Sequence, residues 1–400
     1  MVSRRDFIKG MCSTAALAMA GTLYPGMVFA NAITDRRLVV VILRGGMDGM
    51  AALAPYGDKN YAALRGDLAL DPSALLRVDP FFGLHPSLGP LADLYKNGEM
   101  IAVPASASPY RERSHFDAQN ILELGSTKPH GLDSGWLNRL VGAINATEDT
   151  ALAFGQGLPT IMRGRESVNS WAPSALPDVG DDYLSLISKV YAHDPLFSKN
   201  FAKAINIQDM SMDVLDGNER SMTRQSRSPQ AFVTMAKTAG QWMARPDGPR
   251  IATLELGGWD THVRQGAEGG RMANNLSLFA RGIGELKSGL GSHWSRTVVL
   301  AVTEFGRTAR PNGNLGTDHG TAGTLFLFGG AIKGGRIVHK WPGLSDADLY
   351  EGRDLRPTID IREVVNGILH EHFGISHNTL INDIYPGSRG VGHIKGLIRI

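Results

Sequence analysis

The chain has 400 residues, an apolar content of 42%, no long run of like charges and a formal net charge of only +2. This composition describes a globular protein with a sizeable core and argues against a basic nucleic-acid-binding surface. Glycine, at 48 residues, is abundant, which is typical of α/β proteins with many tight strand-to-helix loops. Because the net charge is so low, we expect no nucleic-acid partner.

The first 32 residues have the organisation of an export signal. A pair of arginines precedes a mildly apolar segment at 11–28, and small residues offer cleavage sites after Ala30 or Ala32. This order resembles a twin-arginine signal peptide, so we expect residues 1–32 to be removed. The twin-arginine translocation machinery is then a partner, and the mature protein is periplasmic or secreted. The apolar segment is short for a membrane span, so we expect no stable span after cleavage, although an uncleaved anchor remains an alternative.

Cleavage would also remove Cys12, the only cysteine, together with a net charge of +2. The mature chain would then carry almost no net charge and no thiol. Any metal would be held by histidine, aspartate and glutamate side chains, which suit hard or borderline divalent ions such as Zn, Mn, Mg or Ca.

Apolar runs and amphipathic segments alternate along the mature chain. The runs predict strands at 37–43, 100–104, 151–154, 251–256, 297–303 and 324–328. Helical spacing predicts helices at 86–95, 114–124, 226–244 and 359–372, and a long one whose apolar face holds Met272, Leu276, Phe279, Ile283 and Leu286. This alternation predicts an α/β fold with a mostly parallel central sheet between two helical layers.

Two features of this plan concern the site and the domain organisation. Ser114 is expected to cap the helix at 114–124, with Phe116, Ile121 and Leu124 facing the core. Residues 126–250 contain clusters of proline, glycine and serine, and could include an insertion that caps the site. No linker separates that region clearly, so we expect a single domain over 33–400.

Polar side chains follow several of the predicted strands. Because the carboxyl ends of neighbouring parallel strands meet at one sheet edge, we expect these side chains to converge. They are Asp48, Asp260, His262, Glu304, Asp318 and His319. Carboxylates and imidazoles at this density suit one or two divalent cations. Two ions about 3.5–4 Å apart would clamp the attacking and leaving oxygens of a phosphoryl- or sulfuryl-type transfer.

Four of these residues also have a structural interpretation. Asp48 could cap a helix or stabilise its glycine-rich turn. Asp260 and His262 could form a turn before the next helix. Glu304 could form an ion pair with Arg307 at the end of its strand.

The remaining candidates would act on the substrate. The hydroxyl of Ser114, at a helix N-terminus beside a cation, would have a lowered pKa and could be a nucleophile, although it could equally only cap its helix. His115 is a further catalytic candidate and, like Arg113, could contact the substrate. Arg44 and Arg307 could bind an oxyanion through their planar donor groups.

Five segments carry a resemblance to a known family. They are residues 43–49, 113–118, 257–262, 303–308 and 318–320. Together they resemble the bacterial domain-of-unknown-function family 1501, over essentially the whole chain from about residue 36. This sulfatase-like family is related to the alkaline phosphatase and sulfatase superfamily. The resemblance implies one large α/β domain of that superfamily's three-layer type, with a metal site at the strand ends, and no established reaction.

Within the superfamily pattern, the resemblance places Asp48 at the first metal-binding aspartate and His319 at the late histidine ligand. Asp260 and His262 resemble the aspartate and histidine of the other metal position, although one residue separates them where the superfamily has three. Glu304 stands where the superfamily has the aspartate of an Asp-His pair, and no histidine follows it. One metal site is therefore the safer expectation.

Two functional hypotheses follow. The first is an exported metal-dependent hydrolase of small anionic phosphate or sulfate esters, in which Ser114 or a water attacks. The second is a non-catalytic sulfatase-like binding or envelope-interaction protein. The density of acidic and imidazole groups favours the first. The missing histidine after Glu304, and an alanine (Ala107) at the formylglycine position of a sulfatase-type motif, favour the second.

Overall fold

The computed structural model describes residues 35–144, 150–172, 181–195, 197–199, 201–202 and 229–399. The predicted signal peptide at 1–32 lies outside these residues. A nine-stranded sheet has the order β11-β5-β10-β9-β1-β8-β6-β7, with β12 paired to β5. Its strands are β1 (Arg37–Leu43), β5 (Met100–Ala107), β6 (Ala151–Phe154), β7 (Asn169–Trp171), β8 (Ile251–Leu256), β9 (Thr297–Val302), β10 (Gly323–Phe328), β11 (Arg336–Ile337) and β12 (Ile359–Asp360).

A small second sheet and the helices complete the described fold. The second sheet consists of β2 (Leu53–Ala54), β4 (Gly83–Leu84) and β3 (Leu76–Arg77). The helices are α2 (Gly49–Ala52), α3 (Tyr61–Arg65), α4 (Gly89–Lys96), α5 (His115–Leu124), α6 (Trp136–Ala143), α7 (Asp181–Tyr191), α10 (Pro229–Ala244), α11 (Arg271–Leu290), α12 (Ile361–Phe373) and α13 (His377–Thr379).

Most strand pairs of the large sheet are parallel. β1 pairs in parallel with both β8 and β9, so Val40 lies opposite Thr253 on one side and Leu300 on the other. β10 is antiparallel to its neighbours β9 and β5. The loop that leads into Gly323 therefore lies at the same sheet edge as the carboxyl ends of β5, β9, β1 and β8.

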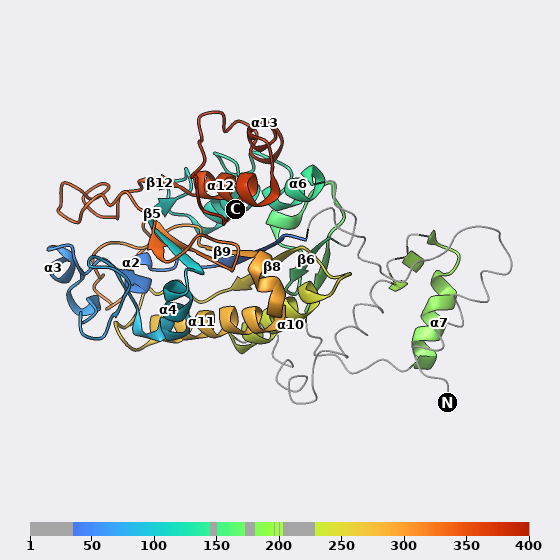
Figure 1. Ribbon diagram of the computed structural model, residues 1–400, viewed down its shortest axis with the longest axis horizontal. Helices are drawn as coiled ribbons and strands as arrows, with labels where there is room; N and C mark the ends of the chain where they lie inside the picture. Colours follow the sequence, from blue (N-terminus) through green and yellow to red (C-terminus); the bar gives the residue numbers. More distant parts are fainter. Residues whose placement is uncertain are drawn as a thin grey trace.

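Helices cover both faces of the sheet, and β1 is therefore buried on both. Val39 and Val41 belong to one core cluster, which also contains side chains of α4, α10 and α11. Val40 and Ile42 belong to the other, which contains side chains of α5, α6 and α12. Figure 1 shows α4, α11 and α10 below the sheet and α6 and α12 above it. The structure thus confirms the three-layer α/β sandwich with a mostly parallel sheet.

Most predicted elements are present with small shifts of their ends. The predicted helix at 86–95 is a 3₁₀ turn at Pro86–Leu88 followed by α4, and the segment at 359–372 begins as β12 before α12. α10 covers 229–244 of the helix predicted at 226–244, and residues 226–228 lie outside the described part.

The prediction that Phe116 faces the core is wrong. Its side chain is 88% exposed, whereas Ile121 and Leu124 of the same helix are buried. Five residues of α-helix turn the side chain by about 140° relative to the position of Ile121, which takes Phe116 off the buried face.

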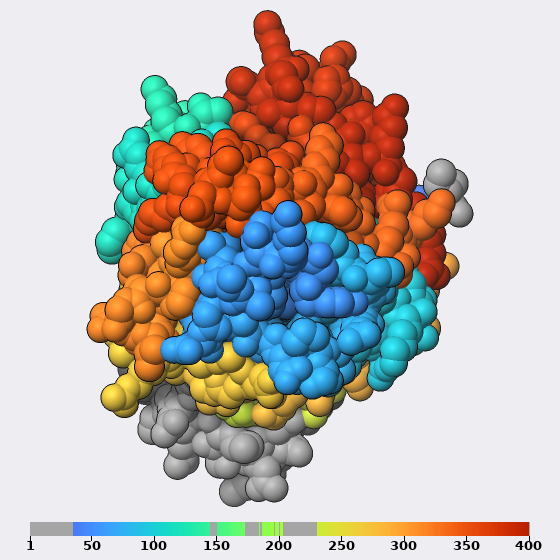
Figure 2. All heavy atoms as spheres, turned by 90° about the vertical axis from the view of Figure 1, so that its left-hand side faces the viewer, coloured from blue at the N-terminus to red at the C-terminus, as the bar shows by residue number. Residues whose placement is uncertain are grey.

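Segments far apart in the sequence share one surface. Figure 2 shows the blue segment around residues 50–90 bordered above and on its left by orange segments from beyond residue 260. In the region 126–250, β6 and β7 extend the large sheet and α6 and α10 cover it, while α7 lies apart (Figure 1). A cap insertion there remains a prediction. None of the helices in the described ranges has both the length and the apolar character needed to cross a bilayer.

Candidate metal centre

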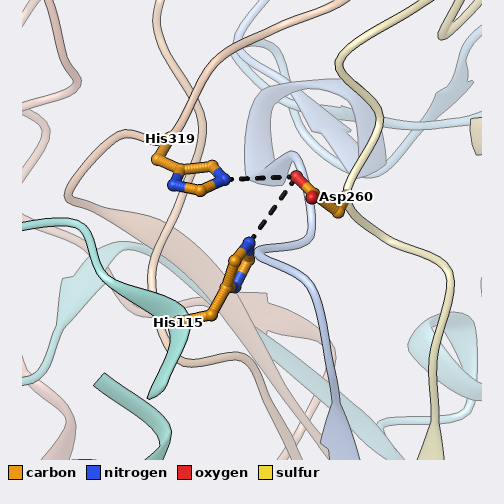
Figure 3. A group of neighbouring side chains, drawn as sticks. All are labelled: His115, Asp260 and His319. Atoms are coloured by element: carbon orange, nitrogen blue, oxygen red, sulfur yellow. Dashed lines mark ion pairs between the residues drawn. The ribbon is translucent and has the colours of Figure 1, made fainter. Parts of the chain in front are cut away.

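The loops at the carboxyl edge of the sheet bring four side chains together. His115 is the first residue of α5, which follows β5. Asp260 and His262 lie in the loop after β8, and His319 lies in the loop between β9 and β10. Figure 3 shows His115 and His319 pointing at the same carboxylate oxygen of Asp260 from two different segments.

Three imidazoles surround Asp260 Oδ1. Their Nε2 atoms lie 3.6 Å (His115), 3.0 Å (His262) and 3.3 Å (His319) from that oxygen. The Nε2 atoms of His262 and His319 are also 3.0 Å apart. One atom each from His115, Asp260 and His319 lies within 4.8 Å of the others, close enough to share one ion.

The other ring nitrogen of each histidine meets an acceptor. His115 Nδ1 lies 2.7 Å from Glu304 Oε1, and His262 Nδ1 lies 3.0 Å from Asp318 Oδ1. His319 Nδ1 lies 2.9 Å from the backbone carbonyl of Arg113. Ionised carboxylates and carbonyls only accept hydrogen bonds, so the three Nδ1 atoms must be the donors. In its neutral form, each ring then presents a lone pair at Nε2.

Neutral rings would leave only acceptors at the centre of the cluster. The Nε2 atoms of His262 and His319 face each other at 3.0 Å, with a carboxylate oxygen of Asp260 beside both. His115 Nε2 is buried and has no hydrogen-bond partner within the described part of the chain. Acceptors in such contact repel one another unless a cation lies between them, and each imidazole bound to a metal usually donates its other N–H to a carboxylate or carbonyl.

The spacing also fits a metal ion. With metal–ligand bonds of about 2.0–2.1 Å, the ligand atoms of a tetrahedral zinc site are about 3.3 Å apart. The spacings around Asp260 Oδ1, at 3.0, 3.3 and 3.6 Å, bracket this value. The side chains of Asp260 and His262 are 44% and 38% exposed, so solvent reaches the site.

The electrostatics favour ionised carboxylates. Burial raises the pKa of Asp260, but the hydrogen bond and charge of Arg307 outweigh it and lower that pKa overall. Burial likewise opposes ionisation of Glu304, and its donors, led by His115, lower its pKa. The hydrogen bond to Glu304 raises the pKa of His115, whereas burial lowers the pKa of His319.

Glu304 does not point into the cluster but stands behind His115. Its Oε1 also accepts from Gly45 N and Gln119 Nε2, both at 2.9 Å. At Gly45, φ is +120°, and a Cβ there would lie 2.6 Å from the backbone nitrogen of Asp260, so a side chain would push this contact apart. Arg307 pairs with Asp260, so the predicted Glu304–Arg307 ion pair is wrong.

Asp318 contacts the Nδ1 atom of His262, as Glu304 contacts the Nδ1 atom of His115. Its Oδ1 also accepts from Asn312 Nδ2 at 2.9 Å, which lowers the pKa of Asp318 most. Glu304 and Asp318 are therefore brought to the site as hydrogen-bond partners of His115 and His262.

Asp48 lies outside the cluster. Its Oδ1 caps α2 by accepting from the amides of Met50 and Ala51, and its Oδ2 accepts from Arg65 at 2.6 Å and Gln265 at 2.7 Å. The side chains of Asp48 and Arg65 are 2% and 0% exposed. The structure therefore assigns Asp48 the alternative role of a helix cap, within a buried ion pair.

Each arginine predicted to bind substrate donates to protein carboxylates. The pairs, with distances of 2.5–2.9 Å, are Arg44 with Glu123 and Glu255, Arg113 with Asp354 and Glu351, and Arg307 with Asp260. Arg307 thus contacts the cluster through Asp260. Arg113 has a left-handed φ of 64°, which is costly for a non-glycine residue, and its carbonyl receives the His319 hydrogen bond.

Ser114 caps α5, as predicted. Its hydroxyl accepts from the amide of Asp117 at 3.5 Å. None of the hydrogen bonds found between described residues joins Ser114 to Asp260 or to the three histidines.

Sequence analysis missed two features of the site. The sequence predicts His115 as a catalytic residue, whereas in the structure its Nε2 lies beside Asp260 Oδ1, among the candidate ligand atoms. Gln119 was not singled out, although it lies four residues after His115 and therefore on the same helix face. That spacing is the signal that could have identified it.

Comparison with known proteins places these observations in a family. None of the curated proteins matches the chain. Solved structures with a similar course of the chain include a putative sulfatase from Bacteroides thetaiotaomicron (9% identity, 90% of this chain and 73% of that one, TM-score 0.41). They also include the lipoteichoic acid synthase LtaP from Listeria monocytogenes (11% identity, 92% and 79%, TM-score 0.39). A third is a Vibrio parahaemolyticus protein of the alkaline phosphatase superfamily (11% identity, 82% and 69%, TM-score 0.36). The model of the family described as "Protein of unknown function (DUF1501)" matches residues 79–385, well over half of the sequence, and the chain belongs to that family.

Proposed function

We propose that the protein is an exported, metal-dependent hydrolase of small phosphate or sulfate esters. The observation that carries this proposal is the convergence of three imidazole Nε2 atoms on Asp260 Oδ1, each imidazole being held by an acceptor at its Nδ1. The twin-arginine sequence at the N-terminus supports export to the periplasm.

The donor set favours one ion. Three imidazoles and one carboxylate suit zinc better than magnesium or calcium, which prefer oxygen ligands. Among the residues that the structure describes, His115, Asp260 and His319 form one group compact enough to hold an ion. His262 lies at its edge, with its Nε2 3.0 Å from both Asp260 Oδ1 and His319 Nε2. We therefore propose a single zinc-type site at His115, Asp260, His262 and His319.

A divalent cation at this place would polarise an ester oxygen as a Lewis acid and lower the pKa of water. The chain itself supplies orientation. Glu304, Asp318 and the Arg113 carbonyl hold the three imidazoles in one tautomer, and Arg307 Nη1 donates to Asp260 Oδ1 at 2.7 Å. Since Ser114 is engaged as a helix cap, we favour attack by water over attack by Ser114.

A second function has support from the arginines. Arg44, Arg113 and Arg307 all donate to protein carboxylates, which weakens their capacity to bind an anionic substrate. A non-catalytic periplasmic protein that uses the same site to bind a ligand or an envelope partner is therefore the alternative.

The test begins with metal content. The mature chain, residues 33–400, is purified and analysed for bound elements, then assayed with aryl phosphate monoesters, aryl phosphate diesters and aryl sulfates. We expect about one equivalent of zinc or a similar ion per chain, and turnover of at least one ester class. His262→Ala and His319→Ala should each lose most of the metal, whereas His377→Ala, at an exposed position of α13, should retain it.

The outcomes separate the two functions. Bound metal without turnover of any ester would favour the binding protein. Metal below about a tenth of an equivalent, with no turnover, would refute the hydrolase and would show that protons rather than a metal separate the acceptors.

A further inference from the structure

A cleft opens beside the metal centre. It has a volume of about 460 Å³ and lies between the exposed side of α5 and the segment 155–160 that follows β6. Its walls include Phe116, Gln119, Glu123, Leu158, Arg163 and Glu255, and we refer to it as the Phe116 cleft. Clefts of roughly 300–1,000 Å³ are the usual size for small-molecule sites.

Phe116 gives the cleft an aromatic surface. The ring is 88% exposed and belongs to the residue directly after His115. Leu158 and Pro159 add apolar surface to the lining. The Phe116 ring is exposed to solvent and has apolar neighbours, so it can stack against the C–H face of a ligand.

The charge of the cleft is balanced. Its lining includes two arginines, Arg44 and Arg163, and two glutamates, Glu123 and Glu255. Arg44 lies between the two glutamates, 2.9 Å from Glu123 and 2.5 Å from Glu255. Because the charges cancel, the cleft offers little attraction to a second anionic group.

Polar atoms at the rim remain suited to a neutral ligand. The Arg163 side chain is exposed and donates its Nε to the Leu158 carbonyl, and its terminal N–H groups have no hydrogen-bond partner among the described residues. The Glu255 side chain is 37% exposed and offers acceptors. Planar donors and acceptors beside an aromatic ring match a ligand that carries adjacent hydroxyl groups.

One side chain connects the cleft to the metal centre. Gln119 Oε1 accepts from Arg44, and Gln119 Nε2 donates to Glu304 Oε1, which accepts from His115. A ligand that contacts Gln119 in the cleft would therefore be separated by this one side chain from Glu304, which holds the candidate metal ligand His115.

We propose that the Phe116 cleft binds an uncharged, polyhydroxylated group, such as a neutral sugar, with Phe116 as its stacking surface. In catalysis this group would be the organic part of the ester, and that role rests on the proposed hydrolase function. Binding itself depends on the cleft alone.

The test measures binding without turnover. The mature chain is titrated calorimetrically with neutral hexasaccharides of glucose, galactose, mannose, xylose and N-acetylglucosamine. We expect at least one to bind, and Phe116→Ala to weaken that binding at least about tenfold. Phe116→Tyr should restore it, because the ring is kept. Phe197→Ala, which removes another exposed phenylalanine (53% exposed) from a different segment, is the matched control and should bind like the parent.

Several outcomes would overturn the proposal. Failure of every hexasaccharide to bind at millimolar concentration would do so, as would unchanged affinity in Phe116→Ala. Equal loss in Phe197→Ala would point to a general defect instead of a stacking site. Metal content is measured on the same samples, so a cleft that binds sugar in a metal-free chain would uphold this inference while refuting the hydrolase.

Discussion

Glu304 Oε1 lies 2.7 Å from His115 Nδ1, and this contact determines the direction of the other ring nitrogen. The glutamate is 0% exposed and receives three further donors, so it stays ionised and acts only as an acceptor. His115 must therefore donate from Nδ1, which turns its Nε2 toward Asp260. Glu304 thus acts on the candidate site through His115.

Replacing this carboxylate should weaken the metal site without unfolding the chain. Glu304→Gln keeps the size of the side chain but removes the charge that orients His115. We expect metal affinity to fall about 10–100-fold, the usual effect of losing such an outer partner. Competition with a chromogenic chelator measures the affinity. Glu255→Gln, which alters a carboxylate of the cleft, should change it little, and equal losses in both variants would contradict the assignment.

Ser114→Ala separates the helix cap from a nucleophile. The structure shows Ser114 Oγ accepting from the α5 amide of Asp117, so its loss should cost about 1 kcal/mol of unfolding free energy. Hydrolysis, where present, should persist in part because we favour attack by water. Ser376→Ala, which removes the cap of α13, provides a control for capping alone. Complete loss of turnover with metal still bound would identify Ser114 as the nucleophile.

Asp48→Asn distinguishes a structural carboxylate from a metal ligand. The change leaves the buried guanidinium of Arg65 without its charged partner at 2.6 Å. Breaking a buried pair in this way should cost about 3–5 kcal/mol in chemical denaturation. Metal content of the folded fraction should stay near one equivalent. Asp93→Asn, at an exposed pair with Lys96, should change stability by less than about 1 kcal/mol. Metal loss without destabilisation would restore Asp48 as a ligand.

His372 should make stability depend on pH. Burial lowers its pKa from 6.5 to about 4, and the charge of Arg36 contributes in the same direction, while its Nε2 bonds the Arg37 carbonyl. Between pH 4 and pH 6.5 the unfolded chain binds a proton that the folded chain does not. Stability from this residue is therefore complete above about pH 6.5 and is lost as the pH falls to 4, a change of about 3 kcal/mol.

The variant His372→Gln checks this window. Glutamine stays neutral and can donate to the same carbonyl, so the free energy of unfolding should vary less between pH 6.5 and 4 than in the parent. His377→Gln, at an exposed site, should keep the parental slope. A slope unchanged in His372→Gln would place the pH dependence elsewhere.

Much of the scaffold could be predicted because it depends on local patterns. The apolar run at 37–43 is β1 with both faces buried, and the run at 251–256 is β8 at its side. Parallel neighbours end at one edge, so Asp260, His262 and His319 could be grouped before their positions were known. The prediction failed at Phe116, where helical spacing alone does not say how far the first turn of α5 extends beyond the sheet.

The sequence by itself determined the element order, the sheet edge at which polar loops gather, and three of the four residues at the candidate metal centre. Tertiary structure decided which atoms of those side chains face one another. Asp48 and Glu304 are both acidic residues that follow buried strands. The carboxylate of Asp48 accepts hydrogen bonds from Arg65 and Gln265. The carboxylate of Glu304 accepts them from His115 and Gln119 instead. Carboxylates are satisfied by whichever donors the fold brings within about 3 Å, and most of these donors come from distant parts of the chain. Residue type and spacing therefore indicate that a site exists, and long-range packing assigns each residue its place in it.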